Sequence, residues 1–244
     1  MIARAGKRLA AAAVAGVLAA HAAPAAAAAP ERAAVTPTAT EPVTVAAMGD
    51  SLTQGYGLAQ GAGFVPRLQA WLDAHGGGVV VLNAGVSGDT TAGGRARVDW
   101  TLTPEVDALI VALGGNDVLR GIAPREARAN LDAILGRADA AGVPVLLIGI
   151  GAPGNYGPDY KAAFEAIYPE LAAAHGALLV RDFLAPLRAA VAAGTPRARL
   201  MQADGIHPSA EGVRLIVDAI GPEVLNLVAR ARRASPPGSA RPSP

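Results

Sequence analysis

Three turns in the sequence combine glycine with small polar residues that could take part in catalysis. They are Gly49-Asp50-Ser51, the stretch from Asn83 to Asp89 that includes Ser87 and Gly88, and Gly114-Gly115-Asn116-Asp117. Glycine at such turns lets backbone N–H groups come close to a ligand. Taken singly, each turn has the composition of an ordinary connector. A functional reading therefore depends on the groups that would work with them.

Ser51 is one of only six serines in 244 residues. A serine hydroxyl is a poor nucleophile until a base takes its proton, and that base must be held in orientation. His75 and His175 stand beside glycine at expected helix ends, where the helix dipole favours a histidine. His207 follows Asp204 by three residues. One short turn would then present both side chains, so we predict Ser51 as nucleophile, His207 as base and Asp204 as the group that orients it.

The Asp204–His207 pair has two other interpretations. It would be part of a metal site if further ligands were near, but no other histidine or carboxylate cluster is visible, and the chain has no cysteine. It would also fit the first turn of a helix capped by Ser209, a role that is compatible with catalysis. We expect no metal and no cofactor.

The tetrahedral intermediate of acyl transfer needs hydrogen-bond donors for its oxyanion. The backbone N–H groups of Ser51 and Gly88 and the side-chain amide of Asn116 would supply three donors from three strand ends. We predict that these residues form the oxyanion hole.

The elements that must position these groups alternate between strand and helix. Short apolar runs occur at Val43–Met48, Val79–Leu82, Ala108–Leu113, Val143–Ile150 and Ala177–Val180, with helical periodicity between them. This alternation predicts a parallel sheet of about five strands, covered by helices on both faces. Ligands bind outside the carboxyl ends of such strands, where the turns lie. Apolar residues from Val213 to Val228 predict a long terminal helix, which Gly221-Pro222 should kink or interrupt.

The two ends of the chain differ from this pattern. Residues 1–29 have a basic start, an apolar run too short to span a bilayer, and an alanine tract, which is the layout of a secretory signal peptide. Residues 30–42 are predicted to be a linker and 234–244 a disordered tail. This leaves one domain at 43–233 in an exported protein, periplasmic or secreted, without a stable membrane anchor. After cleavage 18 basic and 20 acidic residues remain, so we expect no nucleic-acid partner.

Four blocks of the sequence, in order, resemble those of the SGNH (GDSL-type) hydrolases. The blocks are Gly49-Asp50-Ser51-Leu52, Val86–Thr90 with Gly88, Gly114–Asp117, and Asp204–Pro208. Within that superfamily, Leu113–Gly121, Pro153–Gly157 and Ala166–Pro169 are similar to the bacterial periplasmic acyl-CoA thioesterase I, lysophospholipase and arylesterase subgroup. The resemblance extends from about Val43 to the terminal helix.

The resemblance implies a three-layer α/β/α, flavodoxin-like fold and the same roles for Ser51, His207, Asp204, Gly88 and Asn116. It also implies substrate-binding residues in the subgroup motifs, namely Asp117, Leu119, Pro153, Asn155 and Tyr156. The expected protein is a monomeric serine esterase or thioesterase that cleaves small-molecule or lipid acyl substrates, such as aryl esters, acyl thioesters and lysophospholipids, through an acyl-enzyme.

Two alternatives remain open. A carbohydrate O-deacetylase would use the same triad, but aromatic residues, on which sugars stack, are only 4% of the chain. A non-catalytic flavodoxin-like binding module is also compatible with the fold, because fold alone does not specify function. The joint presence of Ser51, Asp204 and His207 disfavours it.

Overall fold

Five parallel strands form the central sheet of the computed structural model, which describes residues 41–234. Along the chain they are β1 (Val43–Gly49), β2 (Val79–Gly85), β3 (Ala108–Ala112), β4 (Val145–Ile148) and β5 (Leu178–Val180). Their order across the sheet is β2-β1-β3-β4-β5. This is the flavodoxin-like order, in which the direction of winding changes between β1 and β3. The prediction of a parallel sheet of about five strands is confirmed.

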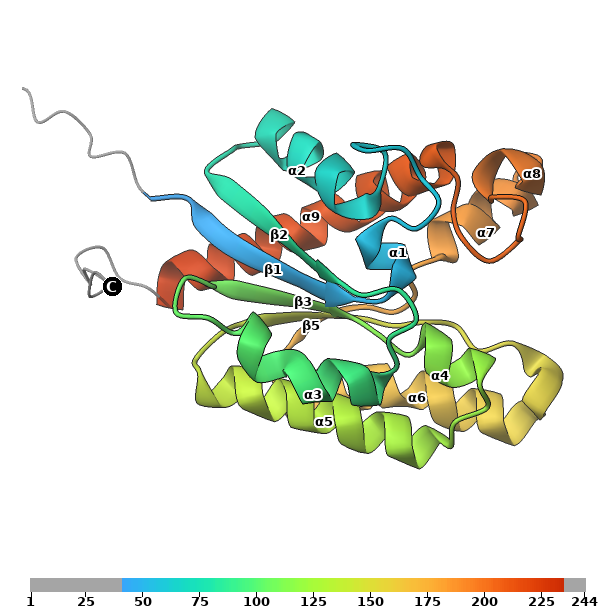
Figure 1. The fold of residues 1–244 in the computed structure, drawn as a ribbon, viewed down its shortest axis with the longest axis horizontal. Helices are drawn as coiled ribbons and strands as arrows, with labels where there is room; N and C mark the ends of the chain where they lie inside the picture. Colours follow the sequence, from blue (N-terminus) through green and yellow to red (C-terminus); the bar gives the residue numbers. More distant parts are fainter. Residues whose placement is uncertain (1–40, 235–244) are drawn as a thin grey trace, which may run out of the picture. The chain divides into compact units, whose positions relative to one another are not determined.

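Helices cover both faces of the sheet and complete three layers (Figure 1). One face carries α2 (Phe64–Ala74), α7 (Ala185–Ala192) and α9 (Ala210–Ala234), and the other carries α3 (Thr91–Thr101), α5 (Pro124–Ala140) and α6 (Pro158–Ala174). Four shorter elements are α1 (Ser51–Gln54), α4 (Gly115–Leu119), the 3-10 turn η1 (Gly154–Tyr156) and α8 (Arg197–Leu200). Because helices lie on both sides, every residue of β3 and β4 is buried and apolar.

The terminal helix α9 runs through Gly221-Pro222 without the interruption that the sequence predicts. Residues on both sides of this pair, such as Val217 and Val224, are buried in the core and hold the helix in place. Gly221 also lies against the ring of Trp71 on α2, where an added Cβ would come within 2.6 Å of a ring carbon. Packing against α2 therefore outweighs the loss of one helical hydrogen bond at proline.

The ends of the predicted domain lie at the limits of the described residues. β1 begins at Val43, as predicted, and α9 ends at Ala234. The predicted signal peptide (1–29), nearly all of the linker (30–42) and the tail beyond Ala234 lie outside the described residues and stay predictions. Within residues 41–234, no helix has both the length and the apolar character that crossing a membrane requires.

The strand register brings the three sequence turns together. Gly49 at the end of β1 is aligned with Gly85 of β2 on one side and with Ala112 of β3 on the other. The residues that come after these positions leave the sheet at the same edge, next to the change in winding direction. Ser51, Gly88 and Asn116 are therefore neighbours although they are far apart in sequence.

His175 connects α6 to α5, on the face of the sheet that also carries α3. At the end of α6, the Nδ1 of His175 lies 2.5 Å from Asp139 and its Nε2 lies 2.9 Å from Asp132, both on α5. Burial lowers the pKa of His175, but the hydrogen bonds that its ring donates to Asp139 and Asp132 outweigh this effect, and the net pKa is raised. The protonated ring is therefore the form that stabilises the fold.

This contact makes stability depend on pH. In the unfolded chain histidine titrates near pH ~6.5, so the stabilisation is complete below that pH and is lost as pH rises through the higher folded pKa. We expect His175→Gln to lower the free energy of unfolding more at pH ~5.5 than at pH ~9, by up to about 1 kcal/mol because the carboxylates are exposed. Urea unfolding at both pH values measures this.

The matched control is His75→Gln. His75 also ends a helix, but its Nδ1 lies 2.7 Å from the carbonyl oxygen of Trp71, not from a carboxylate. If the loss in the free energy of unfolding depends on pH in the same way in both variants, the contacts of His175 with Asp132 and Asp139 are not its cause.

Candidate active site

The three residues predicted to form a catalytic triad lie in hydrogen-bonding contact. The Nε2 of His207 is 2.9 Å from the Oγ of Ser51, and its Nδ1 is 2.7 Å from the Oδ2 of Asp204. A carboxylate only accepts hydrogen bonds, so Nδ1 carries the proton and donates to Asp204. In the neutral ring Nε2 is then an acceptor and faces the serine hydroxyl. The geometry suits transfer of the serine proton to His207.

One tight turn presents both Asp204 and His207. The Oδ1 of Asp204 accepts hydrogen bonds from the backbone N–H groups of Ile206 and His207, at 2.9 and 3.0 Å, which leaves Oδ2 for the ring. The side-chain hydrogen bond from His207, followed by these two backbone hydrogen bonds, lowers the pKa of Asp204 to about 2. Asp204 is therefore ionised at any pH at which a histidine could act as a base. Ser209 caps the next helix, since its Oγ accepts from Gly212 N–H at 3.1 Å, and this cap occurs together with the triad geometry.

Ser51 is the first residue of α1, directly after the central strand β1. Asp50 caps this short helix, and its Oδ1 accepts from the N–H of Leu52 at 3.0 Å. The N–H groups of a first helical turn have no partner within their own helix, so that of Ser51 is available to the site. Burial raises the pKa of Asp50 to about 6, against the opposing effects of the Leu52 hydrogen bond, His207 and Asn116.

Gly88 and Asn116 lie beside Ser51 in the wall of one cavity. Gly88 has a φ of +84°, a conformation that favours glycine and turns the loop after β2 back toward β1. The amide Nδ2 of Asn116 donates to the backbone oxygen of Asp89 at 2.9 Å and, over a longer distance of 3.4 Å, to the Oδ2 of Asp50. One strong and one weak contact hold this amide at the site.

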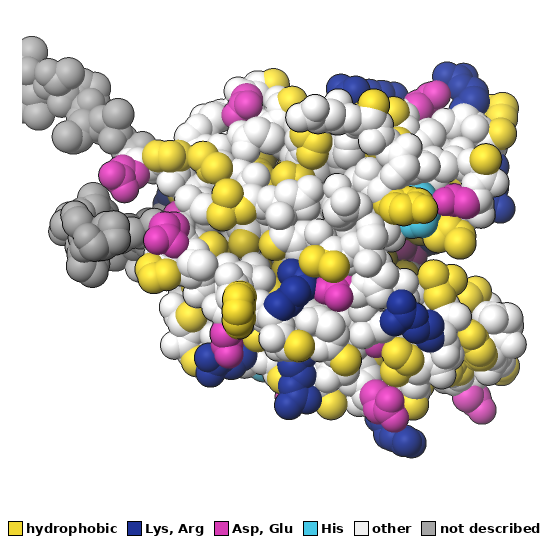
Figure 2. All heavy atoms as spheres, in the orientation of Figure 1, with side chains coloured by type: hydrophobic (Ala, Val, Ile, Leu, Met, Phe, Trp, Pro, Cys, Tyr) yellow, Lys and Arg dark blue, Asp and Glu magenta, His cyan; other side chains and the backbone are white. Residues whose placement is uncertain are grey.

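The cavity beside Ser51 has a volume of about 770 Å³. Figure 2 shows its setting, where a histidine (cyan) and an acidic side chain (magenta) lie next to hydrophobic side chains (yellow) at a hollow on the right. Its lining side chains are mostly aliphatic: Leu52, Val118, Leu119, Ile150, Pro153, Leu184, Leu187, Val191, Ala192, Leu200, Met201 and Ile206. Arg188 and Arg197 add positive charge to this wall. The surroundings of Ser51 suit an apolar group next to a reacting polar centre.

The five predicted substrate-binding residues fall into three groups. Leu119 and Pro153 line the cavity, whereas Asn155 and Tyr156 are exposed and not among its lining residues. The prediction that Asp117 binds substrate is wrong. It is completely buried, and its carboxylate accepts hydrogen bonds from the N–H and hydroxyl of Thr91, at 2.8 and 2.5 Å. It joins α4 to the start of α3 instead.

The sequence prediction assigned no role to two arginines near the site. Arg120 donates to the backbone oxygen of Gly88 at 2.9 Å, and Arg97 forms an ion pair with Asp89 at 2.6 Å. The sequence does hold a signal for Arg97, because Thr91, Gly94 and Val98 form the buried stripe of α3 and Arg97 falls beside it. A charged residue on such a stripe needs polar partners inside the fold.

The described residues contain no group of three or more histidine, cysteine or acidic side chains arranged to hold a metal ion. His75 and His175, the other histidines of the described part, are not among the residues that line the Ser51 cavity. His207 is therefore the histidine that the fold brings to Ser51.

Comparisons with known proteins agree with this site. Residues 47–215 match the GDSL-like Lipase/Acylhydrolase family. The chain is 40% identical over 186 residues to Esterase TesA of Pseudomonas aeruginosa, covering 76% of this chain and 89% of that protein. It is 35% identical to Thioesterase 1/protease 1/lysophospholipase L1 of Escherichia coli, with coverage of 76% and 85%.

A solved structure shows the same fold. The chain matches the crystal structure of AlinE4, an SGNH-hydrolase family esterase, with a TM-score of 0.62 and 42% identity, over 78% of this chain and 98% of that one. The matched family region begins within β1 and ends within α9, so it includes the end of β1, the other four strands and all residues that line the Ser51 cavity. The chain therefore belongs to the GDSL-like lipase/acylhydrolase family of SGNH hydrolases and is an ester-hydrolysing enzyme.

Proposed function

We propose that the protein cleaves acyl esters and thioesters through a covalent acyl-enzyme on Ser51. The Oγ of Ser51 attacks the substrate carbonyl carbon while its proton passes to the Nε2 of His207. The tetrahedral intermediate collapses, and His207 gives that proton to the departing alcohol or thiol. A water molecule then attacks the acyl-serine, again with His207 as base, and the carboxylic acid leaves. The contact of 2.9 Å between Ser51 and His207 is the observation that carries this proposal.

Asp204 supports both proton transfers. Each transfer leaves His207 positively charged for a time, and the ionised carboxylate at 2.7 Å stabilises that charge. Because the pKa of Asp204 is lowered to about 2, it does not take the proton itself. Its second oxygen is fixed by two backbone N–H groups, so the ring keeps one orientation throughout the cycle.

The oxyanion hole consists of the N–H groups of Ser51 and Gly88 and the amide of Asn116. These residues come from the ends of β1, β2 and β3 and line the same cavity. Their donors are fixed before the substrate arrives, so they stabilise the developing negative charge without reorganisation. The long 3.4 Å contact from Asn116 to Asp50 is weak, which leaves one amide hydrogen for the oxyanion.

The aliphatic cavity favours an acyl chain as the group next to the carbonyl. A volume of about 770 Å³ is within the range of sites that enclose a whole small ligand. Tyr56 is the one phenylalanine, tyrosine or tryptophan among the described residues lining it, and its ring lies 4.8 Å from that of His207. The cavity therefore offers little aromatic surface on which sugar rings could stack. This favours acyl esters over acetylated carbohydrate as substrates.

The test of this proposal is a series of nitrophenyl esters from acetyl to octanoyl, with acetylated xylan alongside. Each buried methylene contributes about 0.8 kcal/mol, or about fourfold in kcat/KM. We expect kcat/KM to rise at least tenfold between acetyl and hexanoyl before it levels off, and an acyl-CoA of the same length to be hydrolysed as well. Ser51→Ala, measured in parallel, gives the background rate.

Other outcomes point to the alternatives. A maximum at acetyl, together with release of acetate from xylan, would identify a carbohydrate deacetylase. The absence of hydrolysis above the Ser51→Ala background on every substrate would leave a binding module.

A further inference from the structure

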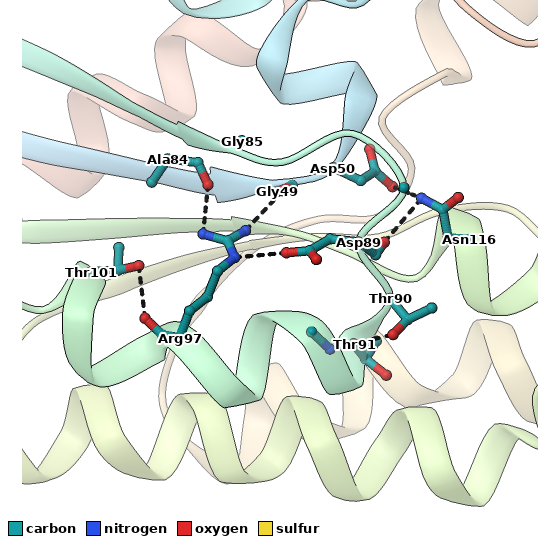
Figure 3. A network of polar contacts seen from close by, with 12 residues as sticks. Gly49, Asp50, Ala84, Gly85, Asp89, Thr90, Thr91, Arg97, Thr101 and Asn116 are labelled. Carbon is teal, nitrogen blue, oxygen red and sulfur yellow. Dashed lines mark hydrogen bonds and ion pairs between the residues drawn. The ribbon is translucent and has the colours of Figure 1, made fainter.

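Arg97 lies beneath the proposed oxyanion hole and contacts three separate segments (Figure 3). Its Nη2 donates to the backbone oxygen of Gly49 at 3.0 Å, and its Nη1 donates to that of Ala84 at 2.8 Å. Its Nε donates to the Oδ2 of Asp89 at 2.6 Å. One guanidinium therefore joins the end of β1, the end of β2 and the loop after β2.

Each of these contacts leads to a group of the reaction centre. Gly49 is two residues before Ser51, and its oxygen also accepts from Val86 N–H at 3.0 Å, so it is shared between the arginine and the loop. Asp89 directly follows Gly88. The backbone oxygen of Asp89 accepts the strong hydrogen bond from Asn116 at 2.9 Å.

Figure 3 shows Asp89 lying between Arg97 and Asn116, with its side chain toward the arginine and its backbone toward the amide. The position of Asp89 thus fixes both neighbours that would bind the oxyanion. Arg97 connects Asp89 to the end of the strand that carries the nucleophile.

Arginine suits these three contacts better than any other residue type. The guanidinium has five donors in a rigid plane, so it can serve an aspartate and two carbonyl groups in different directions at once. Lysine has a single nitrogen on a flexible chain, and a neutral side chain would leave Asp89 without its ion pair. The side chain is only 22% exposed, so its desolvation needs these contacts in return.

We propose that Arg97 is a positioning residue that holds the Gly88 and Asn116 donors in register with Ser51. This inference rests on the proposed function, since it needs an oxyanion to form at Ser51. Arg97 itself touches no reacting atom. Its effect appears in the transition state, because a donor displaced by about 1 Å costs catalysis on the order of 10²-fold while ground-state contacts persist.

The test compares Arg97→Gln and Arg97→Lys with Arg137→Gln. Arg137 is the matched control, because it also forms an ion pair with an aspartate at 2.6 Å, but its partner is Asp99 of α3 and the pair lies on the protein surface. On a nitrophenyl ester we expect both Arg97 variants to lose at least tenfold in kcat, with KM within threefold of the wild type. The control should keep kcat within twofold.

A second readout separates positioning from general stability. An alkyl boronic acid forms an anionic tetrahedral adduct with a catalytic serine, whereas the product carboxylic acid binds without one. At a temperature at which each variant is folded, we expect the Arg97 variants to bind the boronic acid at least tenfold more weakly and the carboxylic acid within threefold. Thermal unfolding is recorded for every variant.

A normal kcat, or equal weakening of both ligands, would overturn the inference and leave Arg97 as a purely structural residue. If Arg97→Gln and Arg97→Lys do not fold, Asp89→Asn decides by the same criteria, because it weakens the ion pair and keeps the Asp89 backbone. Failure of the proposed function looks different. In that case the wild type would show no more activity than Ser51→Ala, and the boronic acid would bind both equally.

Discussion

Replacement of Ser51 by alanine is expected to lower kcat on a nitrophenyl ester by on the order of 10⁴- to 10⁶-fold. The reason is that the acyl-enzyme cannot form without the Oγ, and His207 then has no nucleophile to deprotonate at 2.9 Å. The residual rate would come from substrate binding and the oxyanion donors alone. Steady-state kinetics with highly purified protein measures the loss.

Covalent labelling gives an independent measurement of the same assignment. A fluorophosphonate probe should inactivate the enzyme with one equivalent bound, and peptide mass spectrometry should place the label on Ser51. Ser87 is the matched comparison, because it lines the same cavity but its hydroxyl donates to the Oε1 of Gln54 at 2.7 Å, not to a histidine. Label on Ser87 or Ser209, or full activity in Ser51→Ala, would rule out Ser51 as the nucleophile.

Much of the fold was predictable because its signals are local. The apolar runs that became β1 to β5 were evident from their spacing, and parallel strands bring the turns at their carboxyl ends to one edge of the sheet. The meeting of Ser51 with His207, 156 residues later, is not local. It was predictable because few histidines exist and one of them follows an aspartate at a spacing suited to a short turn.

The errors in the sequence prediction concern burial and orientation. Asp117 stands in the same motif as Asn116, but neighbouring residues on a helix point in different directions. Asn116 therefore faces the cavity, while Asp117 is buried against Thr91. A motif specifies which residues occur together, and the direction of each side chain depends on its surroundings in the fold, here the hydrogen bonds that Thr91 at the start of α3 donates to Asp117.

Arg97 illustrates a different kind of limit. Its three acceptors are one side chain and two backbone carbonyls. Every residue has a backbone carbonyl, so the sequence does not indicate which carbonyls accept a hydrogen bond. The sequence alone shows a charged residue beside the buried stripe of α3. That observation predicts a buried polar contact but not its partners.

The Asn116 amide separates catalysis from binding most clearly. If it donates to the substrate oxygen only when negative charge develops, Asn116→Ala loses transition-state stabilisation and keeps ground-state affinity. Removal of one oxyanion donor typically lowers kcat by about 10²- to 10³-fold, or roughly 2.7–4 kcal/mol. We expect a kcat loss in this range, with KM within about threefold and a melting temperature near that of the wild type.

The competing explanation is that Asn116 serves only to hold the loops together. Its hydrogen bond to the Asp89 backbone is real, and local contacts of this kind stabilise turns. The matched control is Asn83→Ala, because Asn83 lies near the end of the neighbouring strand β2 and also makes hydrogen bonds with backbone groups. Its Oδ1 accepts from Gly85 N–H at 3.0 Å, and its Nδ2 donates to the backbone oxygen of Gln54 at 3.3 Å. Asn83 is not among the residues that line the cavity.

The two variants differ in the position of the lost amide and in one weak contact, the 3.4 Å hydrogen bond from Asn116 to the Oδ2 of Asp50. Both lose an amide that holds a turn, but only Asn116→Ala loses a donor beside Ser51. If the two show equal losses of kcat, or if the Asn116→Ala defect is confined to KM or to melting temperature, Asn116 has a structural role and the oxyanion is stabilised by backbone N–H groups alone. A kcat loss specific to Asn116→Ala would come from the lost donor beside Ser51, because Asn83→Ala also removes an amide that contacts backbone groups, but one that does not line the cavity.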